Sequence, residues 1–129
     1  MRFMMFMYPE ISEAEWGPSV ENVEDIAEMG RYNEELRKAG MLLALDGLYP
    51  PAEGASVSFD GEGVKAVTDG PFTEAKEVVG GYWIIQARSK DEAVEWAKRC
   101  PGRNCRIEVR RVFEMEDFPA EVQAAVEGG

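Results

Sequence analysis

The sequence contains no histidine, and this absence limits the chemistry that the chain can perform. Histidine is the side chain that most often transfers protons near neutral pH, and it is also the commonest metal ligand. A general acid or base would therefore have to be a carboxylate, a tyrosine hydroxyl or a bound water. No phosphate-binding glycine loop is present, since Gly80-Gly81 lacks the required spacing. We expect neither a metal nor a cofactor.

Cysteine is scarce, with only Cys100 and Cys105. Two cysteines are too few for a disulfide framework, and the two further ligands of a zinc site do not stand nearby. The turn residues between them could bring the two thiols close enough for a short-range disulfide. We nevertheless expect reduced thiols, because no signal peptide is visible and the predicted location is the cytoplasm.

The sequence also has few basic residues: 14, compared with 25 acidic ones, which gives a net charge of −11. This charge repels phosphate backbones and anionic lipid surfaces, so direct binding of nucleic acid or of a membrane surface is not expected. No apolar run approaches the ~20 residues of a membrane span. The length of 129 residues predicts a single domain over residues 1–129.

The pattern of apolar residues predicts two β-α-β units with a hairpin inserted between them. Strands are expected over residues 2–8, 41–48, 81–88 and 105–113, the hairpin strands over 56–59 and 64–67, helices over 20–39 and from the Ser89 capping box to Cys100, and a short tail helix over about 119–127. This order is the ferredoxin-like split βαβ arrangement, an α+β fold with two helices on one face of an antiparallel sheet.

The first strand is apolar on both faces, so both faces should be covered. Phe3, Met5 and Met7 would lie on one face, and Met4, Phe6 and Tyr8 on the other. The helices can cover one face, and a second subunit would cover the other, which predicts a homodimer. The alternative is a central strand in a larger monomeric core.

Helical and strand periodicity also assign residues to the helix-covered face. These are Val23, Ile26, Met29 or Gly30, and Leu36 in the first helix, Trp83, Ile85 and Ala87 in the third sheet strand, and Ile107, Val109 and Phe113 in the last. Tyr82, Gln86, Arg106, Glu108 and Arg110 would lie on the opposite face.

The most informative stretch is Asp69-Gly70-Pro71-Phe72, where the inserted hairpin returns to the sheet. The Asp69 side chain can accept hydrogen bonds from backbone N–H groups one and two residues on, which starts a turn. Gly70 tolerates a close backbone neighbour, and Pro71 fixes its own φ. Phe72 would anchor the turn in the protein body.

Those residues, with Thr68 before them, resemble the signature of the YCII-related, or DGPF-domain, family of small bacterial proteins. The resemblance extends to Glu74, Lys76-Glu77, Gly80-Gly81-Tyr82, Asp91-Glu92-Ala93, Trp96-Ala97, Cys100-Pro101, Ile107-Glu108-Val109-Arg110 and the opening residues 2–8. It implies that the ferredoxin-like fold pairs into a dimeric α/β barrel. Some members carry a histidine that could pair with the motif aspartate, and this chain departs from that pattern.

Asp69 is the candidate catalytic residue, as a carboxylate acid or base, and its alternative role is to cap its own turn. Tyr82, Gln86, Glu108 and Arg110 are the candidate ligand-binding residues. Arg110 could hold an anionic ligand, or it could form an ion pair with Glu108 or across a subunit boundary. Tyr82 could line a cleft or pack at the dimer seam.

Two functions are compatible with these residues. The first is an enzyme without a cofactor, or a specific binder, acting on a small organic molecule in a cleft between two subunits. The second, which the resemblance implies, is a non-catalytic dimeric accessory or regulatory module that acts through protein partners linked to transcription initiation.

Overall fold

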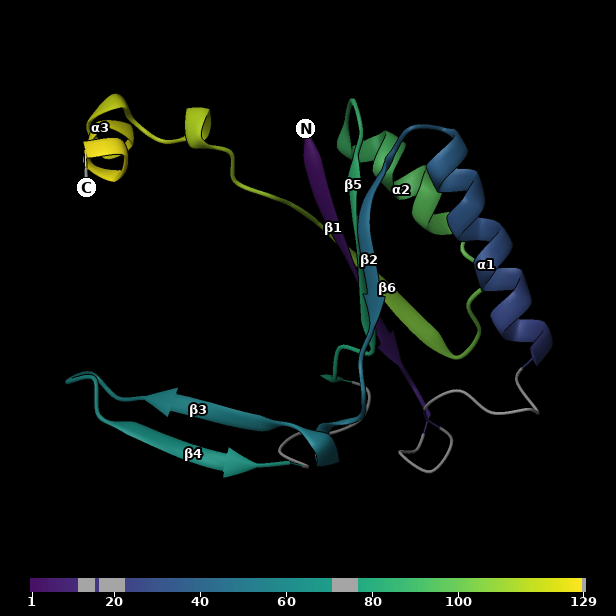
Figure 1. The fold of residues 1–129 in the computed structure, drawn as a ribbon, viewed down its shortest axis with the longest axis horizontal. Helices are drawn as coiled ribbons and strands as arrows, with labels where there is room; N and C mark the ends of the chain where they lie inside the picture. The colour runs from purple at the N-terminus through teal and green to yellow at the C-terminus, as the bar shows by residue number, and fades with distance from the viewer. Residues whose placement is uncertain (12–15, 17–22, 71–76, 129) are drawn as a thin grey trace.

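The structure, a computed structural model, describes residues 1–11, 16, 23–70 and 77–128. A four-stranded antiparallel sheet is built from β1 (Arg2–Pro9), β2 (Leu42–Gly47), β5 (Gly81–Gln86) and β6 (Cys105–Arg111). Helices α1 (Val23–Lys38) and α2 (Lys90–Lys98) pack on one face of this sheet (Figure 1). The strands β3 (Ala55–Phe59) and β4 (Lys65–Asp69) form a separate hairpin, and α3 (Ala120–Gly128) ends the described chain.

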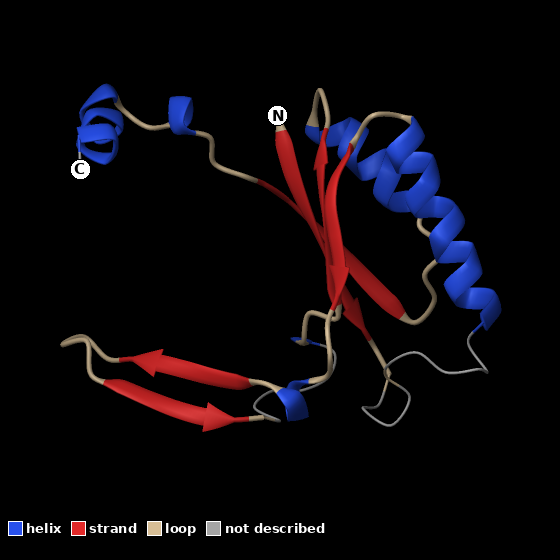
Figure 2. Ribbon diagram, in the orientation of Figure 1, coloured by secondary structure: helices blue, strands red, loops and turns tan. Residues whose placement is uncertain are grey.

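The strand order in the sheet is β2-β5-β1-β6, with β1 and β5 in the centre (Figure 2). All three pairings are antiparallel, as in the split βαβ arrangement. The predicted ferredoxin-like α+β fold is therefore confirmed. The structure describes a single chain, so the dimeric α/β barrel stays a prediction.

The core lies between the sheet and the two helices. Phe3 and Met5 from β1, Trp83 and Ile85 from β5, and Leu36 from α1 are all buried there. Ser89 caps α2 by accepting a hydrogen bond from the backbone N–H of Glu92 at 3.1 Å, which is the predicted helix start. Alternation along β5 thus assigned Trp83, Ile85 and Ala87 to the correct face.

The predicted buried stripe of the first helix is only half right. Leu36 is fully buried and Tyr32 is buried as well, but Val23 and Ile26 are 56% and 51% exposed. Helical periodicity identifies a face but not how far along the axis that face is covered, and here the buried positions lie in the second half of α1. The start of the predicted helix, residues 20–22, lies outside the described residues.

The end of the last strand is also corrected. Phe113 was expected on the helix-covered face, but β6 ends at Arg111 and Phe113 is 72% exposed. Its ring instead lies 5.1 Å from the ring of Phe118, centroid to centroid, beyond the short 3-10 turn Met115–Asp117. The alternating pattern continued past the point where pairing with β1 stops.

The hairpin has one apolar and one polar face. Val57 pairs with Val67 and Phe59 with Lys65, while Ser56 and Ser58 point to the other side. Its turn is held by Asp60, whose Oδ1 accepts the N–H groups of Glu62 and Val64, both at 2.9 Å. The hairpin projects away from the sheet on the side that carries no helices (Figure 1).

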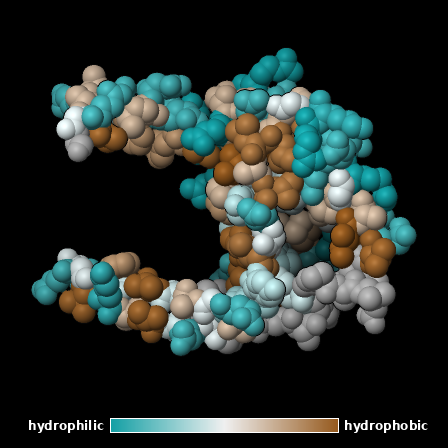
Figure 3. Space-filling model, viewed as in Figure 1, coloured by the Kyte–Doolittle hydropathy of each residue, from teal (hydrophilic) through white to brown (hydrophobic). Residues whose placement is uncertain are grey.

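The segment after β6, residues 112–128, leaves the sheet on the same side and is called here the C-terminal arm. Arg2 fixes its root through two hydrogen bonds to the Glu114 carboxylate, at 2.6 and 3.1 Å. Figure 3 shows hydrophobic side chains at the surface of both the arm and the hairpin, with the sheet face between them. In the described part of the chain, no helix has the length and apolar character needed to cross a membrane.

Candidate functional site

The sheet face opposite α1 and α2, called here the open face, carries a row of side chains across all four strands. The strand registers place Asp46 opposite Tyr82, Tyr82 opposite Phe6, and Phe6 opposite Glu108. The next row toward the start of β1 consists of Ala44, Ile84, Met4 and Arg110. Its first three members are apolar, and the fourth is charged. The open face therefore combines an apolar centre with polar groups on both sides.

Tyr82 and Asp46 form a hydrogen-bonded pair on this face. The Tyr82 hydroxyl donates to Oδ2 of Asp46 at 2.7 Å. That hydrogen bond raises the pKa of Tyr82 above its usual value, so the phenol stays protonated at neutral pH. The sequence singled out Tyr82 but missed Asp46, although alternation in β2 (Leu42–Gly47) places Asp46 on the same face.

A second pair, Tyr8 with Glu108, lies on the other side of Phe6. The Tyr8 hydroxyl donates to Oε2 of Glu108 at 3.3 Å, and the guanidinium carbon of Arg106 lies 4.2 Å from the centre of the Tyr8 ring. Burial, with the Glu108 charge second, raises the pKa of Tyr8. An ion pair between Glu108 and Arg110, one of the alternatives for Arg110, is not present among the described residues, where Glu108 accepts the hydrogen bond from Tyr8.

Arg110 is exposed and forms no ion pair among the described residues. It stands opposite Met4 in the register, one row from Glu108. Gln86 stands at the far end of β5, and its Nε2 donates to the carbonyl of Gly40 at 2.8 Å. The four predicted ligand-binding residues thus share the open face. Strand β1 separates Tyr82 and Gln86 on β5 from Glu108 and Arg110 on β6, and Gln86 is the last residue of β5.

Asp69 lies apart from these residues, at the last position of β4. It is exposed and pairs with Ala55 in the hairpin, on the same hairpin face as Val57 and Val67. The N–H of Gly70 donates to the carbonyl of Gly54 at 3.0 Å, and proline has no N–H, so neither of the two following residues supplies the donor expected for capping by Asp69. Pro71 and Phe72 lie outside the described residues.

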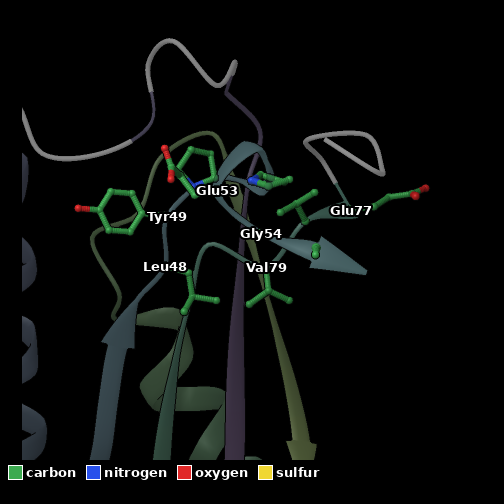
Figure 4. A pocket seen from close by; sticks show the side chains of 10 residues that line it. Leu48, Tyr49, Glu53, Gly54, Glu77 and Val79 are labelled. Carbon is green, nitrogen blue, oxygen red and sulfur yellow. The ribbon is translucent and has the colours of Figure 1, made fainter. Parts of the chain in front are cut away.

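A pocket of about 480 Å³ opens at the root of the hairpin (Figure 4). Residues 48–51, 53–55 and 77–79 line it, most of them apolar, with the carboxylates of Glu53 and Glu77 among them. None of the five predicted site residues lines this pocket, although Asp69 pairs with its lining residue Ala55. The Pro50-Pro51 break and the glycines at 80 and 81 mark its position in the sequence.

The thiols of Cys100 and Cys105 are not joined to each other in the structure. Burial raises the pKa of both thiols, which favours the protonated, less reactive form. Within the described ranges, no three cysteine or carboxylate side chains gather in a way that could hold a metal ion.

The class of protein is a split βαβ domain with a hairpin inserted between its two halves and an Asp-Gly-Pro-Phe motif in its sequence. The model of the YCII-related domain matches residues 1–116 of the chain. The protein therefore belongs to the YCII-related family. The arm residues beyond 116, including α3, lie outside that match.

Among solved structures, the fold is similar to that of 5-chloro-2-hydroxyhydroquinone dehydrochlorinase from Burkholderia phenoliruptrix AC1100, in complex with 2,5-dihydroxybenzoquinone. The two chains are 14% identical, the TM-score is 0.46, and the alignment covers 92% of this chain and 100% of the other. A likeness at this level says nothing about the reaction of the present chain. No curated protein matches it.

Proposed function

We propose that the protein binds or transforms a small organic molecule in a cleft that the open face forms with a second copy of the chain. The observation that carries this proposal is the arrangement of the Tyr82–Asp46 and Tyr8–Glu108 pairs and the exposed Arg110 around Phe6. The two pairs place a few polar groups at fixed positions around an apolar centre, which is the usual composition of a small-molecule site. No observation favours the alternative of a non-catalytic accessory module.

The chemistry of the face defines the kind of ligand. Phe6, Met4 and Ile84 offer a flat apolar surface, and the protonated phenols of Tyr8 and Tyr82 offer hydroxyl groups at its borders. Arg110 is a permanent cation that can bind a carboxylate or phenolate with two hydrogen bonds. A small aromatic acid or hydroxylated aromatic fits these groups best.

Because the chain has no histidine, turnover would use a carboxylate, a tyrosine hydroxyl or a bound water as acid or base. Asp46 and Glu108 lie on the open face itself, where they accept hydrogen bonds from the hydroxyl groups of Tyr82 and Tyr8. Asp69 remains the candidate acid or base on the hairpin side of the cleft.

The test is a screen of aromatic and aliphatic carboxylates and phenols by thermal shift and ligand-observed NMR. For a compound that binds, Arg110→Gln should weaken binding roughly 10- to 100-fold, the usual effect of losing a charge-assisted hydrogen bond. Arg103→Gln removes the same charge from the exposed turn before β6 and should leave binding unchanged. Equal losses in both variants would show that only net charge matters and would overturn the proposed site.

For a compound that is also converted, Asp69→Asn separates the two possible roles of Asp69. Lost turnover with retained binding assigns it to catalysis. Unchanged turnover removes Asp69 from the site and leaves the open-face carboxylates as the acid or base.

A further inference from the structure

Among the described residues, helix α3 has no surface of its own chain to pack on. None of its residues is buried, and Val122 and Val126 are 40% and 59% exposed. The hydrogen bonds that the described residues give it are local, such as Gln123 Nε2 to the carbonyl of Phe118 at 2.7 Å. A helix of nine residues is marginal in water without tertiary packing. The apolar stripe formed by Val122, Ala125 and Val126 therefore needs an apolar surface to pack against.

The apolar face of the β3–β4 hairpin is likewise not covered by the described residues. Val57, Phe59 and Val67 form its apolar face, and all three are exposed. A two-stranded hairpin needs a third layer or strand to be stable. Both elements stand away from the sheet, one on each side of the open face (Figure 1).

The arm is held in this outward position by contacts at its root. Arg2 binds Glu114, Arg111 binds Asp117 at 3.2 Å, and the backbone N–H of Glu114 donates to Asp117 Oδ2 at 2.7 Å. With its root fixed to β1 and β6, α3 lies far from the hairpin of its own chain in Figure 1. The surface that covers it must come from another molecule.

We propose that α3 of each chain packs on the apolar face of the β3–β4 hairpin of a second copy. This packing gives each marginal element the layer it lacks, and it does so reciprocally, as a two-fold interface requires. The two helix–hairpin contacts would close the two ends of the cleft between the open faces, so this proposal rests on the proposed function for the role of the cleft.

Charge decides between the two ways in which a two-fold axis can pair these elements. Residues 112–128 carry five acidic side chains, Glu114, Glu116, Asp117, Glu121 and Glu127, and no basic one. Pairing arm with arm would bring two such acidic segments together, which is unfavourable. The apolar face of the hairpin instead carries one basic and one acidic side chain, Lys65 opposite Phe59 and Asp69 opposite Ala55, so its charges balance. Arm-to-hairpin pairing is therefore the favoured arrangement.

The test uses the full chain in a sample that mixes isotopically labelled and unlabelled copies. Isotope-filtered nuclear Overhauser effects should connect the methyl groups of Val122 and Val126 in one copy with Phe59 and Val67 in the other. Amide hydrogen exchange of α3 should be slowed about 10-fold or more relative to an unstructured segment.

Matched variants separate docking from folding. Val122→Asp on the apolar stripe and Val57→Asp on the apolar hairpin face should each abolish the intermolecular signals and the protection of α3. Ala124→Asp, on the opposite side of α3, and Ser58→Asp, on the polar hairpin face, add the same charge and should preserve both.

The outcomes distinguish this proposal from the proposed function. A dimer in which α3 exchanges as fast as an unstructured segment would overturn the docking of α3 and leave the cleft intact. Signals that arise only within one copy would overturn it as well. A chain that is monomeric at NMR concentrations would overturn both.

Discussion

Gly70 stands where the neighbouring backbone leaves no room for a Cβ atom. A Cβ atom built on it would stand 1.6 Å from the carbonyl oxygen of Pro51 and 2.4 Å from the carbon of that group. Both are backbone atoms, so a neighbouring side chain cannot move aside to make room. The close approach also brings the Gly70 N–H to the carbonyl of Gly54, at 3.0 Å. The motif glycine thus holds the end of β4 against the segment that begins the hairpin.

We predict that Gly70→Ala destabilises the protein by roughly 1–3 kcal/mol, the usual cost of overpacking, because residues 51–54 and 70 must separate. Gly61→Ala is the matched control, since a Cβ there meets nothing within 4 Å, and it should change stability by less than about 0.5 kcal/mol. Urea denaturation of the three proteins measures both effects. Equal stability of the two variants would contradict the close packing at Gly70.

At the scale of elements, Tyr32 links α1 to α2. It is buried, its hydroxyl donates to the carbonyl of Trp96 at 2.7 Å, and its ring meets that of Trp83 edge to face with centroids 6.0 Å apart. Burial raises the pKa of Tyr32, because a phenolate would lose its hydration there. The two helices are therefore joined by a hydrogen bond that exists only while the phenol keeps its proton.

Tyr32→Phe should cost about 1 kcal/mol at pH 7, the usual value of one hydrogen bond. The folded pKa is raised, so the stabilisation is complete below the ordinary tyrosine pKa of about 10 and is lost as pH rises above it. The parent should lose about 1.4 kcal/mol per pH unit more than the variant, so their stabilities should meet close to pH 11. Urea denaturation at both pH values checks this, with Tyr49→Phe as control at pH 7. A constant difference would show that Tyr32 does not hold its proton.

The type and order of the elements could be predicted from the sequence because they depend on local patterns. The alternation in β5 and the Ser89 cap of α2 are examples. The extent of burial could not, since it depends on where neighbouring elements end: Val23 lies on the correct helix pattern but remains exposed. The candidate site was predicted in part, because strand alternation places Tyr82 and Arg110 on one face, whereas the Tyr82–Asp46 pair depends on the register between β2 and β5.

At the scale of the whole molecule, the described residues leave three apolar regions uncovered: the open face, the apolar face of the hairpin and the stripe of α3. Monomeric soluble proteins rarely expose contiguous apolar patches larger than a few hundred Å². The net charge of −11 opposes the association of two copies, so association has to come from local apolar and charge complementarity. A homodimer that buries all three regions meets these conditions.

Ile84→Lys tests this dimer at the centre of the open face. Ile84 stands between Ala44 and Met4 in the register and is half-buried, so a lysine there can extend its ammonium group to solvent in a monomer. The added charge changes the net charge from −11 to −10 and therefore lowers the general repulsion between copies. Any weakening of the dimer must then come from the open face itself.

Light scattering after gel filtration at micromolar concentration should give twice the chain mass for the parent and one chain mass for Ile84→Lys. Val23→Lys, which adds the same charge on the exposed start of α1, should remain a dimer. Circular dichroism confirms that each variant is folded. If the parent elutes as a monomer, or if Ile84→Lys stays a dimer of unchanged affinity, the open face is not the interface, and the pocket at the hairpin root becomes the place to search for a ligand.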